Sequence, residues 1–351
     1  MIQALLAEDS KTTAELLRQM LESDPEIRVV GTAVNGEEAV SMARDLKPNV
    51  IVMDVHMPLV NGFEATQRIM TDFPTPIIIV SSTVDVHEKA VSMKALELGA
   101  LALMEKPKGP EHPEFESECR HFLSTVRALS AVKVVRRWAN HNTGTPLRRL
   151  TPAPSPRRAL AEIVAIAAST GGPAALHRVL SSVPQDFDAP VMIVQHMASG
   201  FIEGFAEWLD SGTRLTVRVA RPGMKLENGV VYVAPDDRQL GLSDPRTIDV
   251  NSGLPIDGFR PSGTHLFRSV ALHYGSKALG VILTGMGRDG VEGLRSLRGA
   301  GGRVVAQDEA TSVVFGMPGV AVAAGLAHDV LPLESIGPRL GEWVMSRTRS
   351  V

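Results

Sequence analysis

The sequence has 351 residues but only one cysteine, Cys119. A single thiol excludes an intrachain disulfide and a zinc site built from several cysteines. No apolar run approaches the ~20 residues that a membrane-spanning helix needs, and the first residues, MIQALLAEDS, lack the basic start of a secretory signal. These absences predict a cytoplasmic protein without membrane insertion.

The chain also lacks a large excess of charge of either sign. The net charge is only −3, with 21% charged and 44% hydrophobic residues, which is typical of a globular protein and not of a polycation that coats nucleic acid. The length exceeds that of one typical domain and suits two. We expect a first domain at residues 1–124, a linker at 125–158 and a second domain at 159–351.

The expected linker differs in composition from both flanking regions. Residues 127–158 contain eight Arg or Lys, four Pro and no Asp or Glu. This composition suits either a patch that binds nucleic acid or an anionic membrane, or a solvated tether between two domains. Because Trp138 is the only aromatic residue there that could stack on bases, we favour the tether and expect no nucleic-acid partner.

In both expected domains, short β-rich runs alternate with runs of helical periodicity, for example at 61–70 and 87–98. This alternation predicts an α/β fold class with parallel strands and helices on both faces of each sheet. The predicted strands of the first domain are Ile2–Ala7, Val29–Val34, Val50–Asp54, Ile77–Ser81 and Leu101–Glu105. Those of the second domain are Ile163–Ala168, Val191–Gln195, Leu215–Val219, Val230–Ala234, Ala278–Thr284 and Arg303–Ala306.

Acidic residues follow two of the predicted strands in the first domain. Glu8 and Asp9 come directly after the first strand, and Asp54 ends the third. Because neighbouring parallel strands end at the same edge of a sheet, these carboxylates should converge. Clustered carboxylates favour a hard divalent cation such as Mg²⁺, which would neutralise an incoming phosphoryl group and leave one carboxylate as its acceptor.

Two further residues strengthen this interpretation. Ser81 ends the fourth predicted strand and can donate its hydroxyl to a phosphoryl oxygen, while Lys106 follows the fifth and can pair with the same group. Each of these residues alone would suit a solvated loop. Their occurrence on successive strand ends predicts a phosphorylation site that requires Mg²⁺.

Residues 1 to about 124 resemble the response-regulator receiver family. The resemblance rests on Glu8-Asp9, Val52-Met53-Asp54, Met57-Pro58, Gly62, Ser81 and Lys106-Pro107. It implies a (βα)5 flavodoxin-like fold in which a histidine kinase phosphorylates Asp54. It also implies Mg²⁺ coordination by Asp9, Asp54 and the backbone carbonyl of His56, with Glu8 acting through water, a switch hydroxyl at Ser81 and phosphate pairing by Lys106.

One position departs from the receiver pattern. Many receivers place an aromatic switch residue three positions before the lysine, where this chain has Leu103. We therefore expect that the output surface of this domain does not work by an aromatic rotamer flip.

In the second domain, Ser169 lies in a predicted tight turn. The turn, Ala168-Ser169-Thr170-Gly171-Gly172-Pro173, joins a predicted strand to an amphipathic helical run. Three interpretations fit it: a loop that cradles a nucleotide phosphate, a nucleophilic serine, or a serine that caps a helix. The turn matches neither GxGxxG nor GxxxxGK[ST], which disfavours the phosphate loop.

Two other strand ends supply an imidazole and a carboxylate. His196 follows Val191–Gln195, and Asp289 lies in a glycine-rich turn after the run that begins at Ala278. A serine hydroxyl needs a base such as histidine to accept its proton, and a carboxylate fixes the histidine tautomer and stabilises the imidazolium. Backbone amides can stabilise the resulting oxyanion, and we expect Met286 and Thr170 to supply them.

Residues from about 160 to 347 resemble the catalytic domain of the chemotaxis protein-glutamate methylesterase family, CheB. The resemblance rests on Ala-Ser-Thr-Gly-Gly-Pro at 168–173, Val-Gln-His-Met at 194–197, Leu-Thr-Gly-Met-Gly-Arg-Asp-Gly at 283–290 and Gln-Asp-Glu-Ala-Thr-Ser at 307–312. It implies a doubly wound, mostly parallel α/β domain without a cofactor. By position, Ser169 would be the nucleophile, His196 the general base and acid, Asp289 the orienting carboxylate and Met286 an oxyanion donor.

The family's activity would be hydrolysis of glutamate methyl esters on methyl-accepting chemoreceptors, with release of methanol, and deamidation of receptor glutamines. In the family the receiver blocks the catalytic site until it is phosphorylated, and we expect the same here. A non-enzymatic regulator is the alternative interpretation, in which the receiver gates a module whose Ser169 turn holds a nucleotide or another anion.

Overall fold

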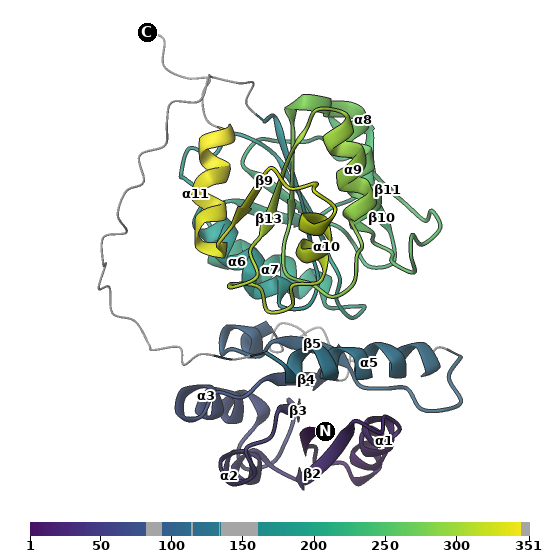
Figure 1. Ribbon diagram of the computed structural model, residues 1–351, viewed down its shortest axis with the longest axis vertical. Coiled ribbons are helices and arrows are strands. Elements are labelled where there is room, and N and C mark those ends of the chain that lie inside the picture. Colours follow the sequence, from purple (N-terminus) through teal and green to yellow (C-terminus); the bar gives the residue numbers. More distant parts are fainter. Residues whose placement is uncertain (82–92, 114, 133, 135–160, 345–351) are drawn as a thin grey trace.

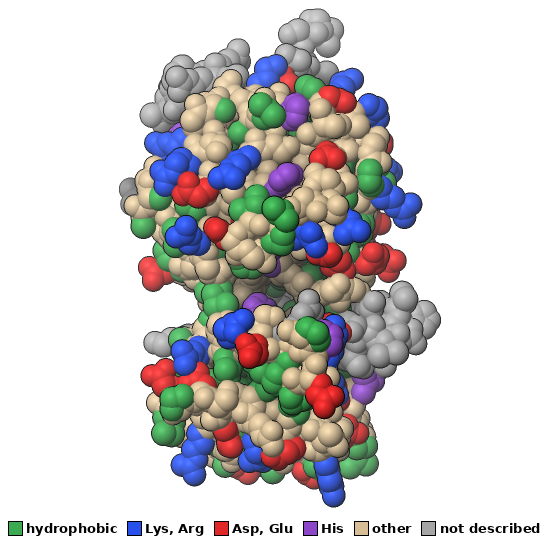
Figure 2. Space-filling model, turned by 90° about the vertical axis from the view of Figure 1, so that its right-hand side faces the viewer, with side chains coloured by type: hydrophobic (Ala, Val, Ile, Leu, Met, Phe, Trp, Pro, Cys, Tyr) green, Lys and Arg blue, Asp and Glu red, His purple; other side chains and the backbone are tan. Residues whose placement is uncertain are grey.

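The structure is a computed structural model that describes residues 1–81, 93–113, 115–132, 134 and 161–344. Two α/β lobes lie one above the other (Figure 1), and a narrower waist separates them in the space-filling view (Figure 2). The N-terminal lobe contains the described residues up to 134, and the C-terminal lobe contains residues 161–344. Most of the expected linker falls outside the described residues.

The N-terminal lobe contains a five-stranded parallel sheet with the strand order β2-β1-β3-β4-β5. Helices cover both faces, because alternate strand residues belong to two separate apolar clusters. The strand order reverses between β1 and β3, and the predicted acidic residues lie at the ends of these two strands. Its elements are β1 Ile2–Ala7, α1 Lys11–Glu22, β2 Ile27–Ala33, α2 Gly36–Leu46, β3 Val50–Asp54, α3 Gly62–Asp72, β4 Ile77–Ser81, β5 Ala102–Glu105 and α5 Phe115–Ser130.

The C-terminal lobe is built on a seven-stranded parallel sheet with the order β14-β13-β12-β6-β7-β9-β8. Its strand order reverses between β6 and β12, which makes the crevice beyond these two strands the expected ligand site. The elements are β6 Ile163–Ala168, α6 Gly172–Ser181, β7 Val191–Gln195, α7 Ile202–Gly212, β8 Thr216–Val219, β9 Val230–Val233, β10 Gln239–Asp244, β11 Thr247–Asn251, α8 Gly263–Tyr274, η1 Gly275–Lys277, β12 Ala278–Ile282, α9 Val291–Gly299, β13 Arg303–Gln307, α10 Met317–Ala323, β14 Asp329–Leu331 and α11 Leu333–Val344.

Helices cover both faces of this second sheet as well. On one face, α6, α7 and α11 pack through residues such as Leu176, Phe205 and Leu340. On the other face, α8, α9 and α10 pack together with the antiparallel β10–β11 hairpin (Figure 1). All six residues of the central strand β6 are buried, as expected for a parallel strand covered on both sides. The doubly wound α/β prediction is therefore confirmed for both lobes.

Several strand boundaries differ from the prediction. The strands β1, β3, β4, β6 and β7 have the predicted bounds, but β12 ends at Ile282 and not at Thr284. Its apolar run continues, yet the amide of Thr284 donates to the side chain of Gln307 (2.8 Å) and no longer to a strand. The sequence reasoning missed β10, β11 and β14, and the helical run predicted at 87–98 begins outside the described residues.

Within the described part of the chain, no helix combines the length and apolar character needed to cross a membrane.

Candidate active site and phosphorylation site

Ser169 and His196 occupy matching positions on two neighbouring strands of the C-terminal lobe. Ala168 of β6 pairs with Gln195 of β7, and Ser169 and His196 are the next residues on each strand. The amide of His196 donates to the carbonyl of Ala168 (3.0 Å), which extends the pairing to the strand ends. Ser169 is 8% exposed, so most of this residue is buried at the sheet edge.

The turn that follows Ser169 requires glycine at two positions. Gly171 adopts φ +76°, a left-handed conformation that other residues rarely adopt. At Gly172, a Cβ atom would lie 2.0 Å from Oε1 of Gln195. These constraints place the N-terminus of α6 directly after the serine, which was one of the predicted features of the turn.

Gln195 was not assigned a role from the sequence, yet it connects the two strand ends. Its side-chain amide is buried and donates to the carbonyl oxygens of Ser169 (2.9 Å) and His196 (2.7 Å). Two hydrogen bonds from one buried donor group hold both backbone segments at a fixed separation. The signal available in the sequence was a glutamine at the end of a wholly apolar strand, where an unpaired amide would be costly.

Asp289 is the best-satisfied buried carboxylate of the C-terminal lobe site. It is 1% exposed and accepts hydrogen bonds from the Ser262 hydroxyl (2.7 Å) and from the amides of Gly263 (2.6 Å) and Thr264 (3.2 Å). These amides begin α8, so the positive end of that helix also faces the carboxylate. Burial alone would raise the pKa of Asp289, but the contact with His196 and these hydrogen bonds outweigh it and lower the pKa to about 2.

The His196 ring contacts one group along its edge and another on its face. Its Nε2 atom lies 3.0 Å from Oδ2 of Asp289. The ring of Phe259 stacks on the imidazole with a centroid distance of 4.3 Å and an interplanar angle of 11°. Both ring nitrogens are buried, and among the described residues neither makes a contact with the geometry of a hydrogen bond. The carboxylate and the imidazole are therefore close enough for their charges to interact, and Nδ1 is left for a further partner.

Backbone amides next to the serine are available for a ligand. Gly285 lies against Ser169: a Cβ atom at position 285 would be 2.7 Å from the Cβ atom of Ser169. The Thr284 hydroxyl donates to the carbonyl of Thr170 (2.9 Å) and accepts from the amide of Val314 (2.9 Å), which ties the two turns together. Across the described residues, the amides of Thr170 and Met286 donate no hydrogen bond. Both are the amides expected to stabilise an oxyanion.

In the N-terminal lobe, Lys106 joins two buried carboxylates. Its Nζ atom lies 2.8 Å from Oδ2 of Asp54 and 2.9 Å from Oε2 of Glu8. Asp54 and Glu8 are 2% and 1% exposed, so the lysine neutralises charge that water cannot reach. Burial opposes the charged lysine, but its bonds to Asp54 and Glu8 together hold the pKa of Lys106 above its ordinary value.

The carboxylates of this site are not fully compensated. Burial is the main reason why the pKa of Glu8 is raised, and the nearby charge of Asp54 raises it further despite the bond to Lys106. Ligand atoms of Glu8, Asp9 and Asp54 lie within 4.8 Å of one another. Such an oxygen-only set with excess negative charge fits the ligand preference of Mg²⁺.

The remaining residues predicted for this site lie on the same edge. Ser81 is fully buried at the end of β4, and its carbonyl accepts from the amide of Lys106 (3.0 Å). His56 lies two residues after the end of β3 and carries an exposed side chain. The structure thus gathers the predicted phosphorylation residues at the carboxyl ends of β1, β3, β4 and β5.

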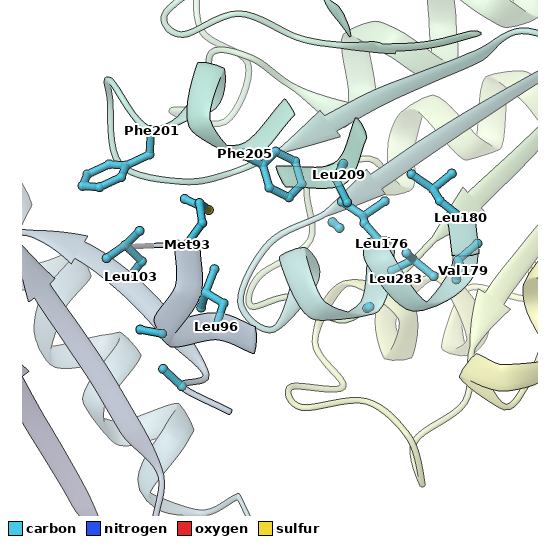
Figure 3. Packing of buried hydrophobic residues seen from close by; sticks show 14 of the residues in the cluster. Met93, Leu96, Leu103, Leu176, Val179, Leu180, Phe201, Phe205, Leu209 and Leu283 are labelled. Carbon is cyan, nitrogen blue, oxygen red and sulfur yellow. The ribbon is translucent and has the colours of Figure 1, made fainter. Parts of the chain in front are cut away.

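An apolar contact joins the two lobes beside the Ser169–His196 edge. Met93, Leu96 and Leu103 of the N-terminal lobe belong to one continuous cluster with Phe201 and Phe205 of the C-terminal lobe. Figure 3 shows Met93 and Leu103 opposite Phe201. Phe201 is fully buried although it precedes α7 by one residue. Leu103, the position without the expected aromatic residue, therefore lies in the contact between the lobes.

A second contact between the lobes lies at the serine turn of the C-terminal lobe. The side chain of Val313 packs on Gly171: a Cβ atom at position 171 would lie only 2.6 Å from it. Val313 and Val314 also pack against the N-terminal cluster that contains Phe122 of α5. Contacts between the lobes therefore flank the Ser169–His196 edge on two sides.

Polar groups complete the contact between the lobes. The indole N–H of Trp208 donates to Glu97, and the same indole stacks on His177 with a centroid distance of 4.8 Å. On α5, His121 lies near enough to His196 for their charges to interact. His121 is exposed, but nearby protein atoms still remove part of its hydration. This desolvation is the main cause that lowers the pKa of His121, and the charge of His196 lowers it further.

Comparison with known proteins agrees with the two-lobe arrangement. The sequence profile of the family described as CheB methylesterase matches residues 164–340, and that of the response regulator receiver domain matches residues 4–112. The catalytic domain of the Thermotoga maritima CheB methylesterase is 40% identical in a structural match with a TM-score of 0.51. This match covers 52% of this chain and 98% of that one.

Curated relatives are similar over nearly their whole length. A protein named protein-glutamate methylesterase/protein-glutamine glutaminase 4 from Myxococcus xanthus (strain DK1622) is 49% identical, with 97% of this chain and 96% of the relative covered. A protein-glutamate methylesterase/protein-glutamine glutaminase 3 from Anaeromyxobacter dehalogenans (strain 2CP-C) is 52% identical, with 98% and 99% covered. Both lobes and their connection are therefore shared with these proteins.

Proposed function

The chain belongs to the CheB methylesterase family with an N-terminal response regulator receiver domain, and from this membership we propose that Ser169, His196 and Asp289 hydrolyse glutamate methyl esters. The observation that carries the proposal is the buried Asp289 carboxylate 3.0 Å from a histidine whose strand neighbour is Ser169. The relatives' names extend the proposal to deamidation of glutamine side chains. They do not favour a non-enzymatic regulator.

The proposed reaction proceeds in two steps. The Ser169 hydroxyl attacks the ester carbonyl while His196 accepts its proton, and the amides of Met286 and Thr170 stabilise the oxyanion. His196 then gives this proton to the methoxide, so that methanol leaves and an acyl-enzyme remains. Water, deprotonated by His196, attacks the acyl-enzyme, and His196 returns this proton to the Ser169 oxygen as it leaves, which regenerates Ser169 and frees the glutamate. For glutamine the leaving group is ammonia, and the other steps are the same.

Asp289 supports this cycle by its charge. Because its pKa is about 2, it remains a carboxylate at neutral pH while His196 alternates between its neutral and protonated forms. A fixed negative charge at the ring edge stabilises the imidazolium that forms in each transition state. Ser262 and the first amides of α8 hold the carboxylate in place.

We further propose that the receiver lobe restrains the enzyme until Asp54 is phosphorylated. The supporting observation is that its contacts reach both Phe201 and Val313, on two sides of the serine turn. A histidine kinase would donate the phosphoryl group, and Glu8, Asp9, Asp54 and the His56 carbonyl would hold Mg²⁺. The ion would neutralise the charge of the phosphoryl group. Ser81 and Lys106 would bind the phosphoryl oxygens.

The proposed substrate is a methylated chemoreceptor and the proposed compartment is the cytoplasm. The proposed domains are 1–124 and 159–351, with a linker at 125–158. Residues 125–130 of this linker belong to α5, so the residues that follow α5 would tether the lobes while they separate. No nucleic-acid partner is proposed, because the surface charge of the chain as a whole is close to balanced.

The test measures methanol release from methylated receptor membranes by the wild type, Ser169→Ala and Asp54→Asn, with and without acetyl phosphate. We expect Ser169→Ala to lose at least about 10³-fold in rate, and Asp54→Asn to keep the basal rate but lose stimulation by the phosphodonor. Release that persists in Ser169→Ala would refute the assigned nucleophile. Equal stimulation of Asp54→Asn and the wild type would refute the assigned phosphorylation site.

A further inference from the structure

The loop before α8 presents one aromatic ring to the proposed catalytic histidine. Phe259 stacks on the His196 imidazole at a centroid distance of 4.3 Å and an interplanar angle of 11°. Asp289 contacts the same imidazole at its Nε2 atom, at a distance of 3.0 Å. The histidine therefore lies between an anion near one ring nitrogen and an aromatic ring stacked on its face.

The position of Phe259 is set by a tight turn. The amides and carbonyls of Ile256 and Phe259 exchange two hydrogen bonds (3.0 and 2.9 Å). Between them, Asp257 and Gly258 have φ values of +51° and +86°, the signature of a type I′ turn with its favoured Asp-Gly pair. This turn has a fixed shape before substrate binds, so the aromatic ring is already placed over the histidine.

Further hydrogen bonds attach the turn to the lobe. The guanidinium of Arg260 binds Asp237 (2.6 Å) and the carbonyls of Ser252 and Gly253, and the buried Gln239 amide donates to the carbonyl of Leu254 (3.1 Å). Leu254 itself is 86% exposed, whereas Phe259 is half-buried. The loop thus holds one apolar side chain against the histidine and leaves another in solvent.

We propose that Phe259 is a positioning residue that holds the His196 imidazole and stabilises its protonated form during catalysis. The face of an aromatic ring carries partial negative charge, so it attracts an imidazolium more strongly than a neutral imidazole. His196 is protonated only after it accepts the Ser169 proton. The stacking therefore strengthens on the way to the transition state and acts on kcat more than on KM.

This inference rests on the proposed roles of Ser169 and His196, and its test uses two readouts. The first is the rate at which a fluorophosphonate labels Ser169, which needs an active serine but no receptor. The second is kcat and KM for methanol release from receptor membranes in the presence of acetyl phosphate. Labelling of the wild type without methanol release would refute the proposed substrate and still leave the role of Phe259 testable.

The full-length variants are Phe259→Leu, Phe259→Tyr and, as a matched control on the same loop, Leu254→Ser. We expect Phe259→Leu to lower both the labelling rate and kcat by roughly 3- to 30-fold, the range given by a desolvated cation–π contact, with KM changed less than about twofold. Phe259→Tyr, which keeps the ring, should restore both rates, and Leu254→Ser should change neither. Phe259→Met replaces the leucine variant if that variant does not fold.

Two results would overturn the proposal. Equal rates for Phe259→Leu and the wild type would show that the ring contributes nothing to the reaction. Equal losses in Phe259→Leu and Phe259→Tyr, or a change confined to KM, would show that Phe259 fills space or contacts substrate and does not act through the imidazole.

Discussion

The two lobes place their proposed sites at equivalent positions but balance charge in opposite ways. Each site lies where the strand order of a parallel sheet reverses, beyond β1 and β3 in one lobe and beyond β6 and β12 in the other. In the C-terminal lobe, Asp289 receives enough hydrogen bonds to lower its pKa to about 2. In the N-terminal lobe, burial raises the pKa of Glu8 despite a lysine at 2.9 Å.

This difference separates a site that is complete from one that needs an ion. A carboxylate whose charge is already stabilised by hydrogen bonds is ionised without a bound ion, so it can stabilise a neighbouring positive charge without a further ligand. An under-compensated carboxylate pair favours a divalent cation, which would add the missing positive charge. The equivalent sheet edges therefore suit the proposed Ser169–His196–Asp289 site in one lobe and the proposed phosphorylation site in the other.

The largest expected effect comes from removing the charge of Asp289, the carboxylate of the C-terminal lobe that hydrogen bonds stabilise. Asp289→Asn should lower kcat by about 10³- to 10⁴-fold, because the uncharged side chain no longer stabilises the imidazolium or fixes its tautomer. Methanol release at saturating receptor concentration measures this loss. A decrease of less than about tenfold would show that the assigned carboxylate is not the orienting group.

The same substitution should also lower stability by an amount that depends on pH. The folded-state pKa of Asp289, about 2, lies below the ordinary value of 3.8. Its charge therefore stabilises the fold by about 2 kcal/mol near neutral pH, and this contribution is lost as the pH falls from about 4 toward 2. The melting temperature of Asp289→Asn should be lower than that of the wild type near pH 7, and the difference should shrink in acid.

A smaller effect is expected when the link between the serine and histidine strands is removed. Gln195→Leu keeps the volume of the side chain but leaves the carbonyls of Ser169 and His196 without their donor. We expect kcat to fall by about 10- to 100-fold, since misplacement by a fraction of an ångström is costly in a positioned site. Fluorophosphonate labelling of Ser169 should slow in parallel. Unchanged labelling would restrict Gln195 to a structural role.

The carboxylate site of the N-terminal lobe, whose negative charge Lys106 does not fully balance, can be probed through its affinity for Mg²⁺. Glu8→Gln removes one buried charge, so we expect the dissociation constant for Mg²⁺ to rise by at least about tenfold, the effect typical of groups that support a metal through other ligands. Calorimetric titration of the full chain measures it. The control is Glu26→Gln, because Glu26 is an exposed residue of the same lobe. Equal Mg²⁺ affinities of Glu8→Gln and Glu26→Gln would contradict the assigned ion site.

The smallest expected effect lies in the contact between the lobes. Leu103→Ala removes part of an apolar side chain that is 9% exposed, which should weaken the contact by about 1–2 kcal/mol and raise the unphosphorylated esterase rate by about 5- to 30-fold. Leu59→Ala is the matched control, because Leu59 is 88% exposed in the same lobe. A basal rate that does not change would indicate that this cluster does not restrain the enzyme.

Much of this arrangement could be predicted from the sequence because both folds are parallel and strongly patterned. The five strands with the predicted bounds are apolar runs that end in a polar or small residue, such as Asp54 or Gln195. Polar residues at such ends converge by the geometry of the sheet alone. The positions of Glu8, Asp54, Lys106, Ser169, His196 and Asp289 on two sheet edges could therefore be predicted, and their chemical roles stay proposals.

Other features depend on contacts that no local pattern encodes. The hairpin β10–β11 is an exception: its short strands do alternate polar and apolar residues, so a local signal was present and the prediction missed it. Ser262 and Phe259 reach the site from a loop that precedes α8, so only the folded chain brings them to Asp289 and His196. The contact of Leu103 with Phe201 likewise depends on how two separately folded lobes meet.

Phe201 gives the resting state a thermodynamic bias. Its side chain is fully buried opposite residues of the receiver lobe, so the proposed separation of the lobes would expose it to water. Exposing a phenylalanine completely costs about 1.5–3 kcal/mol, which would correspond to a population of open molecules between roughly one in ten and one in two hundred. Under the proposed regulation, this cost would favour the closed arrangement again once the phosphoryl group is lost, without a second signal to end the response.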